Sequence, residues 1–287
     1  MIAIYIIAVA SLVAINGAIL GSFMMLRRMS MMCDAIVHAV LPGLVIAYLF
    51  TASRGSFTMV MGAIASGVLA TLLIEWVHAK FRVSADAAIG LTFTTLFSLG
   101  IILIAKFAGR VDLDQDCVLF GELAYVPLDL WITASGMNMG PRSLWSVSAL
   151  TVTVVTFVGM GSRQLVSSTF DPDFARHQGV LVRLWHYLLM FMVSLFTIAS
   201  FHAVGAVMVM GFFILPSATA YLLVRSVRAL ILLACLVGVL SVLLGFLFAQ
   251  FNNVSIAGSI IFVNGIVFAL AAWVYQARRP ARIFENT

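Results

Sequence analysis

Long apolar runs separated by short polar breaks dominate the chain from one end to the other. A helix that crosses a membrane needs about 20 consecutive, mostly apolar residues, and such runs recur along the whole sequence. The pattern predicts an all-α integral membrane protein with about nine transmembrane helices. A count of eight to ten stays open, because two runs are short or interrupted. The predicted spans are residues 2–26, 34–52, 57–78, 86–106, 143–161, 184–199, 203–224, 229–250 and 255–276.

The composition agrees with this fold class. Hydrophobic residues make up 63% of the 287 positions and charged residues only 9%, whereas a soluble domain has about 25% charged residues. The first apolar run lacks the basic start and the small-residue cleavage site of a signal peptide, so we expect it to be a retained helix. The three cysteines are scattered and indicate neither a disulfide framework nor a zinc module. We expect a single transmembrane domain over residues 1–287.

The distribution of basic residues predicts the orientation. If the N-terminus is outside, twelve of the sixteen Lys and Arg residues lie in inner segments, and cytoplasmic loops of membrane proteins carry such an excess. We therefore expect a multi-pass protein of the cell (inner) membrane with a cytoplasmic C-terminus. The net charge of +5 follows from this topology and does not indicate a nucleic-acid partner. The inner basic residues are Arg27, Arg28, Lys80, Arg82, Arg163, Arg176, Arg183, Arg225, Arg228, Arg278, Arg279 and Arg282.

Asp34 and His38 form the strongest candidate site. Helical positions i and i+4 share a face, and a carboxylate with an imidazole can bind a divalent transition metal. Ionisable groups inside a membrane are costly, which favours a functional role. The alternative is that Asp34 only favours a helix N-terminus while His38 packs on a neighbouring helix. The following Leu41-Pro42-Gly43 favours function, because it loosens the backbone beside the pair.

Two ligands are too few for tight tetrahedral binding, so we expect a two-fold dimer to supply four. Arg27 and Arg28 precede Asp34 closely, which places the pair near the inner face. A site closer to mid-membrane would require those arginines to lie in a vestibule or beside a broken helix. Gly and Pro occur in spans 34–52 and 203–224, where broken helices could line a cavity.

The long outer loop is acidic. Asp112, Asp114 and Asp116 alternate with other residues, but the register of a calcium loop is absent. A solvated loop is the simpler interpretation, and such a loop could still attract incoming cations. Glu122 lies closer to apolar sequence and is a candidate contact for ions on the outer side. His202, at the outer end of a predicted helix, could face the same path or could simply pack against a neighbour.

The inner loop between residues 162 and 183 contains a second candidate element. Asp171-Pro172 is a helix-start signal. The short helix it predicts could be a mere connector, or it could dock into a groove of a cytoplasmic partner. Near the inner edge, we expect Glu75 to pair with Lys80 or Arg82. His78, His177 and His186 need no special role.

Missing motifs exclude several functions. The chain has no GxxxxGK[ST], HExxH or GxSxG sequence, so it is not expected to bind ATP by a P-loop or to be an enzyme of those classes. Energy for transport would come from a partner chain or an ion gradient. A gradient-driven secondary transporter is one alternative, although few intramembrane acids beyond Asp34, Glu75 and Asp86 could relay protons or sodium. A structural subunit that binds metal only for assembly is another.

Several ordered sequence blocks carry a family resemblance and span about residues 15–276. The blocks are Arg27-Arg28-Met29-Ser30, Asp34-Ala35, His38-Ala39-Val40-Leu41-Pro42-Gly43, Ser84 to Gly90, Leu119-Phe120-Gly121-Glu122, Phe170-Asp171-Pro172 with Ala175, Val204-Gly205 and Leu215-Pro216 with Ala218-Thr219-Ala220. In these blocks the chain resembles the ABC-3 permeases of ATP-binding-cassette importers, which handle zinc, manganese and iron. Residues 112–127 are most similar to the manganese/iron branch.

The resemblance implies a type II ABC-importer-like permease, embedded in lipid, that dimerises with a second copy or a paralogue. It also implies a cytoplasmic ABC ATPase that hydrolyses ATP and an extracytoplasmic metal-binding protein. The cargo would be Mn, Fe or Zn, with no permanently bound cofactor. Cys33 departs from the pattern beside the metal-contacting positions; a thiolate there would alter metal preference, unless Cys33 is only a small apolar residue. The mapped positions are Asp34 and His38 for metal, and Phe170, Asp171, Pro172, Ala175 and Gly179 for coupling to the ATPase.

Overall fold

The computed structural model describes residues 2–51, 56–107, 123–128, 130–132 and 138–278. Nine helices in these ranges are long and apolar enough to cross a membrane, which confirms the predicted all-α class and the nine predicted spans. The elements are α1 (Ile2–Leu26), α2 (Met32–Thr51), α3 (Ser56–Phe81), α4 (Ala85–Phe107), the 3-10 helix η1 (Leu123–Leu128), β1 (Leu130–Ile132), β2 (Asn138–Pro141), α6 (Arg142–Phe170), α7 (Pro172–His177), α8 (Val182–Val204), α9 (Ala206–Leu223), α10 (Val227–Asn252) and α11 (Ile256–Arg278).

Two expectations about helix continuity were wrong. Helix α6 continues to Phe170, so the first part of the predicted inner loop is helical. Helices α2 and α9 run unbroken through Pro42 and Pro216. The breaks fall instead between helices, at the turn after α1 and at Gly205, whose φ of 82° suits a residue without a side chain.

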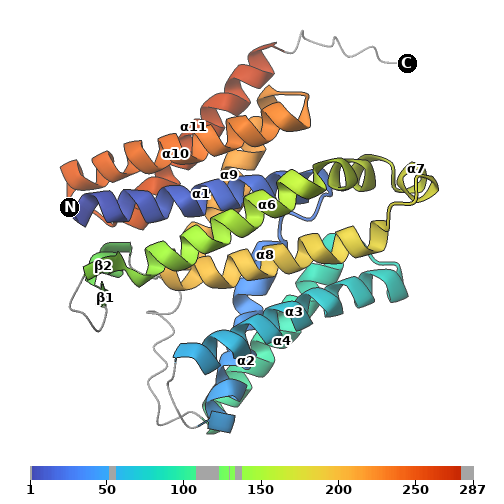
Figure 1. The fold of residues 1–287 in the computed structure, drawn as a ribbon, viewed down its shortest axis with the longest axis horizontal. Helices are drawn as coiled ribbons and strands as arrows, with labels where there is room; N and C mark the ends of the chain where they lie inside the picture. The colour runs from blue at the N-terminus through green and yellow to red at the C-terminus, as the bar shows by residue number, and fades with distance from the viewer. Residues whose placement is uncertain (1, 52–55, 108–122, 129, 133–137, 279–287) are drawn as a thin grey trace, which may run out of the picture.

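The helices form a bundle with two groups (Figure 1). Helix α1 packs against α6, α9 and α10, while α2, α3 and α4 pack on one another at the side of the bundle. Helix α8 lies between the groups and contacts α2, α3 and α6. The short antiparallel β1–β2 hairpin lies at the end of the bundle opposite α7. The two ends of the bundle therefore carry different structures, and the candidate coupling segment occupies one of them.

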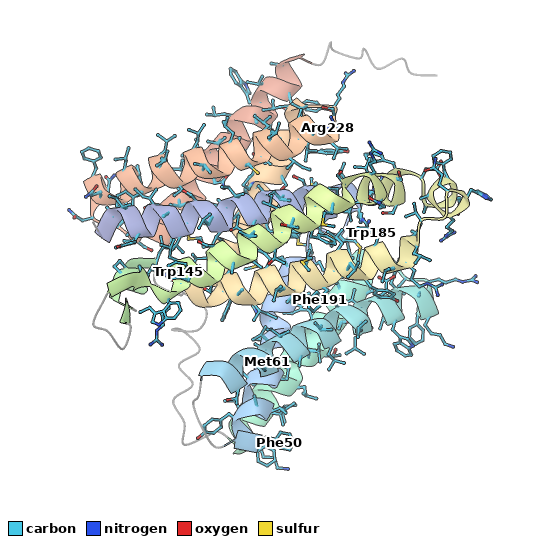
Figure 2. The ribbon with its side chains drawn as sticks, viewed as in Figure 1. Phe50, Met61, Trp145, Trp185, Phe191 and Arg228 are labelled. Carbon is cyan, nitrogen blue, oxygen red and sulfur yellow. The ribbon has the colours of Figure 1, made fainter. Side chains whose placement is uncertain are left out.

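The exterior of the bundle is apolar, as expected for a surface that faces lipid. Large hydrophobic side chains such as Phe50, Met61 and Trp145 project outward from α2, α3 and α6 (Figure 2). Such exposure would be a liability in water, whereas lipid tails solvate it well. The interior is also mainly apolar, and glycines allow close contacts between some of its helices.

Close glycine contacts hold α2 in place. A Cβ atom added to Gly43 of α2 would overlap the Gly62 carbonyl oxygen of α3. On the other side, a Cβ atom at Gly100 of α4 would come within 3.0 Å of Pro42 Cδ. Small residues allow such close approach of helix backbones in membranes. The helix that carries Asp34 and His38 is thus fixed from two sides.

Candidate functional site

Asp34 and His38 meet on one face of α2. His38 Nε2 lies 3.3 Å from Asp34 Oδ1, and the two side chains are 23% and 35% exposed, respectively. Asp34 stands in the first turn of the helix, where the helix dipole favours a carboxylate. The side chains therefore share a face, as their spacing predicts, and remain accessible to an ion.

Two aromatic rings of α4 enclose the imidazole. The ring centroids of Phe93 and Phe97 lie 5.0 and 5.3 Å from that of His38. The second ring nitrogen, His38 Nδ1, is buried and has no hydrogen-bond partner within the described residues. The ring is thus oriented by Asp34 on one side and by aromatic packing on the other, with Nε2 towards the carboxylate.

Pro42 removes one backbone hydrogen bond of α2 just beyond the Asp34–His38 pair. A proline lacks the N–H group that would bond the carbonyl four residues earlier, which here belongs to His38. Ser66 Oγ of α3 donates a hydrogen bond to the neighbouring Ala39 carbonyl. Helix α2 is continuous here, but the Ala39 carbonyl next to His38 accepts a hydrogen bond from α3.

The described part of the chain supplies two candidate metal ligands here, Asp34 and His38. Within the described residues, no group of three or more His, Cys, Asp and Glu side chains is arranged to hold a metal ion. Cys33 is fully buried, and its Sγ lies 3.4 Å from Thr197 Oγ1 of α8. The thiol is therefore engaged on a different face of α2 from Asp34 and His38.

The structure does not describe the side chains of the candidate ion contacts on the outer side. Asp112, Asp114, Asp116 and Glu122 lie outside the described residues. His202 lies within α8, but its side chain is outside the described part. Their predicted roles in admitting cations stay predictions.

The segment around α7 has the form that Asp171-Pro172 predicts. Asp171 is the N-cap, and its side chain accepts a hydrogen bond from the Phe174 backbone N–H at 2.9 Å. Pro172 occupies the first turn, where its missing N–H costs nothing. The chain then leaves the helix through Gly179, whose φ of 79° favours glycine.

Two exposed aromatic side chains lie in this segment, Phe170 at the end of α6 and Phe174 in α7. Phe170 and Phe174 are 62% and 55% exposed, while Ala175 is fully buried and fixes the short helix to the bundle. Arg176 and Asp173 form an exposed ion pair at 2.7 Å. The sequence analysis named Phe170 as a coupling residue and did not name Phe174, which lies on the short helix that Asp171-Pro172 predicts.

The chain thus has an acid–imidazole pair on a membrane helix and a short helix at one end of the bundle. Known proteins are similar to it in sequence over almost the whole length. The sequence profile of the ABC 3 transport family matches residues 2–275. The chain belongs to the ABC 3 transport family.

Relatives of this ABC 3 family member are similar over almost its full length. The manganese transport system membrane protein MntD of Bacillus subtilis is 39% identical over 267 residues, which cover 93% of this chain and 90% of MntD. The zinc transport system membrane protein TroD of Treponema pallidum is 35% identical over 265 residues, covering 92% and 72%. The structure of PsaBC from Streptococcus pneumoniae in complex with Fab gives a TM-score of 0.73 at 28% identity, covering 93% of this chain and 89% of that one.

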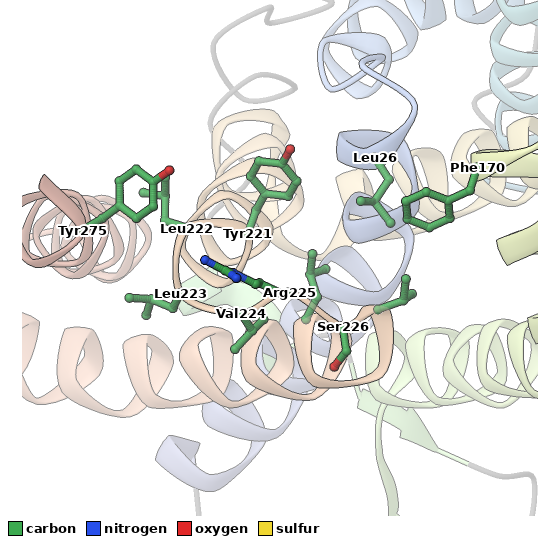
Figure 3. A pocket seen from close by; sticks show the side chains of 11 residues that line it. Leu26, Phe170, Tyr221, Leu222, Leu223, Val224, Arg225, Ser226 and Tyr275 are labelled. Carbon is green, nitrogen blue, oxygen red and sulfur yellow. The ribbon is translucent and has the colours of Figure 1, made fainter. Parts of the chain in front are cut away.

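The structure of this ABC 3 family member also contains a cavity beside Phe170, close to α7. It has a volume of about 760 Å³ and lies between the ends of α1, α6, α9, α10 and α11 (Figure 3). Its wall includes Phe170, Tyr221, Arg225 and Tyr275, but neither Asp34 nor His38. The cavity is therefore separate from the candidate metal site.

One predicted ion pair was wrong in this family member. The Glu75 carboxylate does not pair with Lys80 or Arg82 but lies 3.0 Å from His186 Nε2 of α8. Lys80 and Arg82 lie in the last turn of α3 and just beyond it, where their side chains are exposed. Proximity in sequence suggested those partners, whereas the packing of α3 on α8 supplied a different one.

Proposed function

We propose that this chain is the permease subunit of an ATP-driven importer of divalent transition metals, with manganese as the first candidate cargo. The Asp34–His38 pair is the observation that carries the proposal, because it presents two metal-ligating groups on a membrane helix of a family whose relatives are named for manganese and zinc. The chain itself is the path for the ion and performs no chemical reaction.

The ligand set suits a divalent transition metal and contains no free thiolate. Asp34 offers oxygen and His38 nitrogen, while the softer Cys33 thiol is engaged with Thr197. Carboxylate oxygen suits Mn²⁺, imidazole suits iron and zinc, and thiolates select softer metals. Manganese comes first because relatives such as MntD are named for manganese transport. Two ligands per chain suit brief occupancy, because an ion bound too tightly could not leave. A second copy or a paralogue, facing the same axis, would bring the donor count to four.

The proposed energy source is a cytoplasmic ABC ATPase that docks on α7. Four exposed basic residues lie at helix ends on the α7 side: Arg28 just after α1, Lys80 and Arg82 at the end of α3, and Arg176 in α7. By the positive-inside rule, we propose that this end lies in the cytoplasm and the N-terminus outside, in the cell membrane. An extracytoplasmic binding protein would deliver the metal to the opposite end, near the β1–β2 hairpin.

Uptake of Mn²⁺ into proteoliposomes that contain the whole complex tests this proposal. Uptake is expected to require ATP inside the vesicle, to stop when the ATPase is made catalytically inactive, and to continue when ionophores remove proton and sodium gradients. Uptake that persists without the ATPase and stops with an ionophore would instead establish a gradient-driven secondary transporter.

Phe174→Ala is expected to weaken binding of the ATPase to the permease by at least about tenfold. An aromatic side chain at the centre of an interface commonly contributes about 2 kcal/mol or more, and Phe174 is 55% exposed on α7. Co-purification at graded detergent and salt measures the affinity. Phe251→Ala, at an exposed phenylalanine in the last turn of α10, is the matched control. Equal binding by both variants would contradict docking on α7.

A further inference from the structure

A partly buried polar cluster joins four segments of the bundle close to α7. The Arg27 guanidinium, directly after α1, lies 2.8 Å from His186 Nδ1 of α8 and donates hydrogen bonds to Ser168 Oγ at 3.0 Å and Thr169 Oγ1 at 3.1 Å, both on α6. His186 Nε2 in turn lies 3.0 Å from Glu75 Oε2 of α3. We call these five residues the Arg27 cluster.

The geometry fixes the proton on His186. A guanidinium can only donate hydrogen bonds, so His186 Nδ1 accepts from Arg27. The proton of a neutral imidazole is then on Nε2, which donates to Glu75. The cluster thus consists of a cation, a neutral bridging ring and a carboxylate. Burial lowers the pKa of Arg27 to about 10, against the raising effect of Glu75, so the guanidinium stays charged at neutral pH.

The end of α1 is built to direct Arg27 into this cluster. The backbone N–H groups of Arg28 and Met29 donate to the carbonyls of Met25 and Met24, at 3.1 and 3.0 Å. Arg28 adopts φ of 59° at the position that usually holds glycine in such a helix end. The chain turns sharply there, so Arg27 points into the bundle while Arg28 is exposed.

The cluster lies between the two functional elements. Ser168 and Thr169 belong to the last turn of α6, and Asp171 caps α7 immediately afterwards. On the other side, Arg27 precedes the short turn that leads into α2, the helix of Asp34. A displacement of α7 that moves the end of α6 must therefore either carry Arg27 with it or break two hydrogen bonds.

We infer that Arg27 is a positioning residue that transmits movement of α7 to α2 and hence to the Asp34–His38 pair. This inference rests on the proposed function, in which α7 docks the ATPase. Arg suits the task better than Lys, because its planar fork holds three acceptors on two helices at once. A cluster confined to one helix pair would stabilise the bundle without joining the two elements.

The number of metal ions transported per ATP hydrolysed, in reconstituted complex, tests the inference. Arg27→Met is expected to leave the complex assembled and hydrolysing ATP while this ratio falls about tenfold, within the range of coupling between distant sites. Arg27→Lys should restore part of the ratio. Arg28→Met, at the exposed neighbouring arginine, should match the wild type. An assembled Arg27→Met complex with an unchanged ratio would overturn the inference.

A second pair of variants covers the case in which Arg27→Met fails to assemble. His186→Gln keeps an acceptor for Arg27 and a donor for Glu75, whereas His186→Leu keeps neither. The glutamine variant should retain a clearly higher transport ratio than the leucine variant, and equal ratios would overturn the inference.

The two proposals fail in different ways. If α7 does not dock the ATPase, Phe174→Ala will leave ATPase binding unchanged, and the proposed function fails at that point. If Phe174→Ala weakens binding but Arg27→Met transports metal at the normal ratio, only the role of Arg27 is wrong.

Discussion

Asp34→Ala and His38→Ala should each reduce Mn²⁺ uptake by more than about a hundredfold in cells that express the whole complex. Loss of a group that only supports a ligand already costs a metal site about 10- to 100-fold, and these side chains are the candidate ligands themselves, 3.3 Å apart. Uptake measured by mass spectrometry, with the amount of permease in the membrane measured alongside, gives the result. Uptake of Mn, Fe and Zn is measured side by side, and the metal whose uptake is lost in the variants is the cargo.

Asp86→Ala is the matched control for Asp34→Ala. Both carboxylates stand in the first turn of a helix, Asp34 in α2 and Asp86 in α4, so both gain the same favourable interaction with the helix dipole. If Asp34 only stabilises the N-terminus of α2, the two variants will have the same abundance and the same uptake. Normal abundance with lost uptake for Asp34→Ala alone supports the metal path, and reduced abundance with normal uptake per molecule indicates a structural subunit.

The membrane helices could be predicted because lipid constrains sequence strongly. Each span must hide its backbone hydrogen bonds within an apolar helix, so length and hydropathy alone locate it. The extension of α6 to Phe170 was missed because Arg163 and Gln164 interrupt the apolar run without interrupting the helix. Hydropathy reports where a segment leaves the apolar layer, and a helix can continue beyond that point.

The sequence predicts which side chains share a face of one helix. It does not predict which side chains of different helices meet. Asp34 and His38 share a face because of their spacing, and the same rule places Cys33 about 100° away, where it meets Thr197. The Arg27–His186–Glu75 contacts join α1, α8 and α3, which are far apart in the chain. Nothing in a single sequence fixes which helices lie side by side, so Glu75 was assigned a partner from its own segment.

Gly43→Ala should destabilise the permease by about 1–3 kcal/mol, the typical cost of added volume in a closely packed interior. The new Cβ would overlap the Gly62 carbonyl and Ser66 Cβ of α3. Because one of these atoms is backbone, the helices must separate, and no rotamer change relieves the overlap. The midpoint of thermal unfolding in detergent, together with Mn²⁺ uptake, measures the effect.

Gly159→Ala is the control for this effect, since a Cβ at that exposed position of α6 meets nothing within 4 Å. In a helix interior alanine is favoured over glycine by about 1 kcal/mol, so this variant should be neutral or slightly more stable. Gly43→Ala should also lose uptake beyond its loss of stability, because a shift of α2 away from α3 moves the Asp34–His38 pair and changes the packing of His38 against Phe93 and Phe97 of α4. Equal unfolding midpoints for the two glycine variants would show that the position of α2 does not depend on this close contact with α3, and that its other contacts with α3, α4 and α8 hold it.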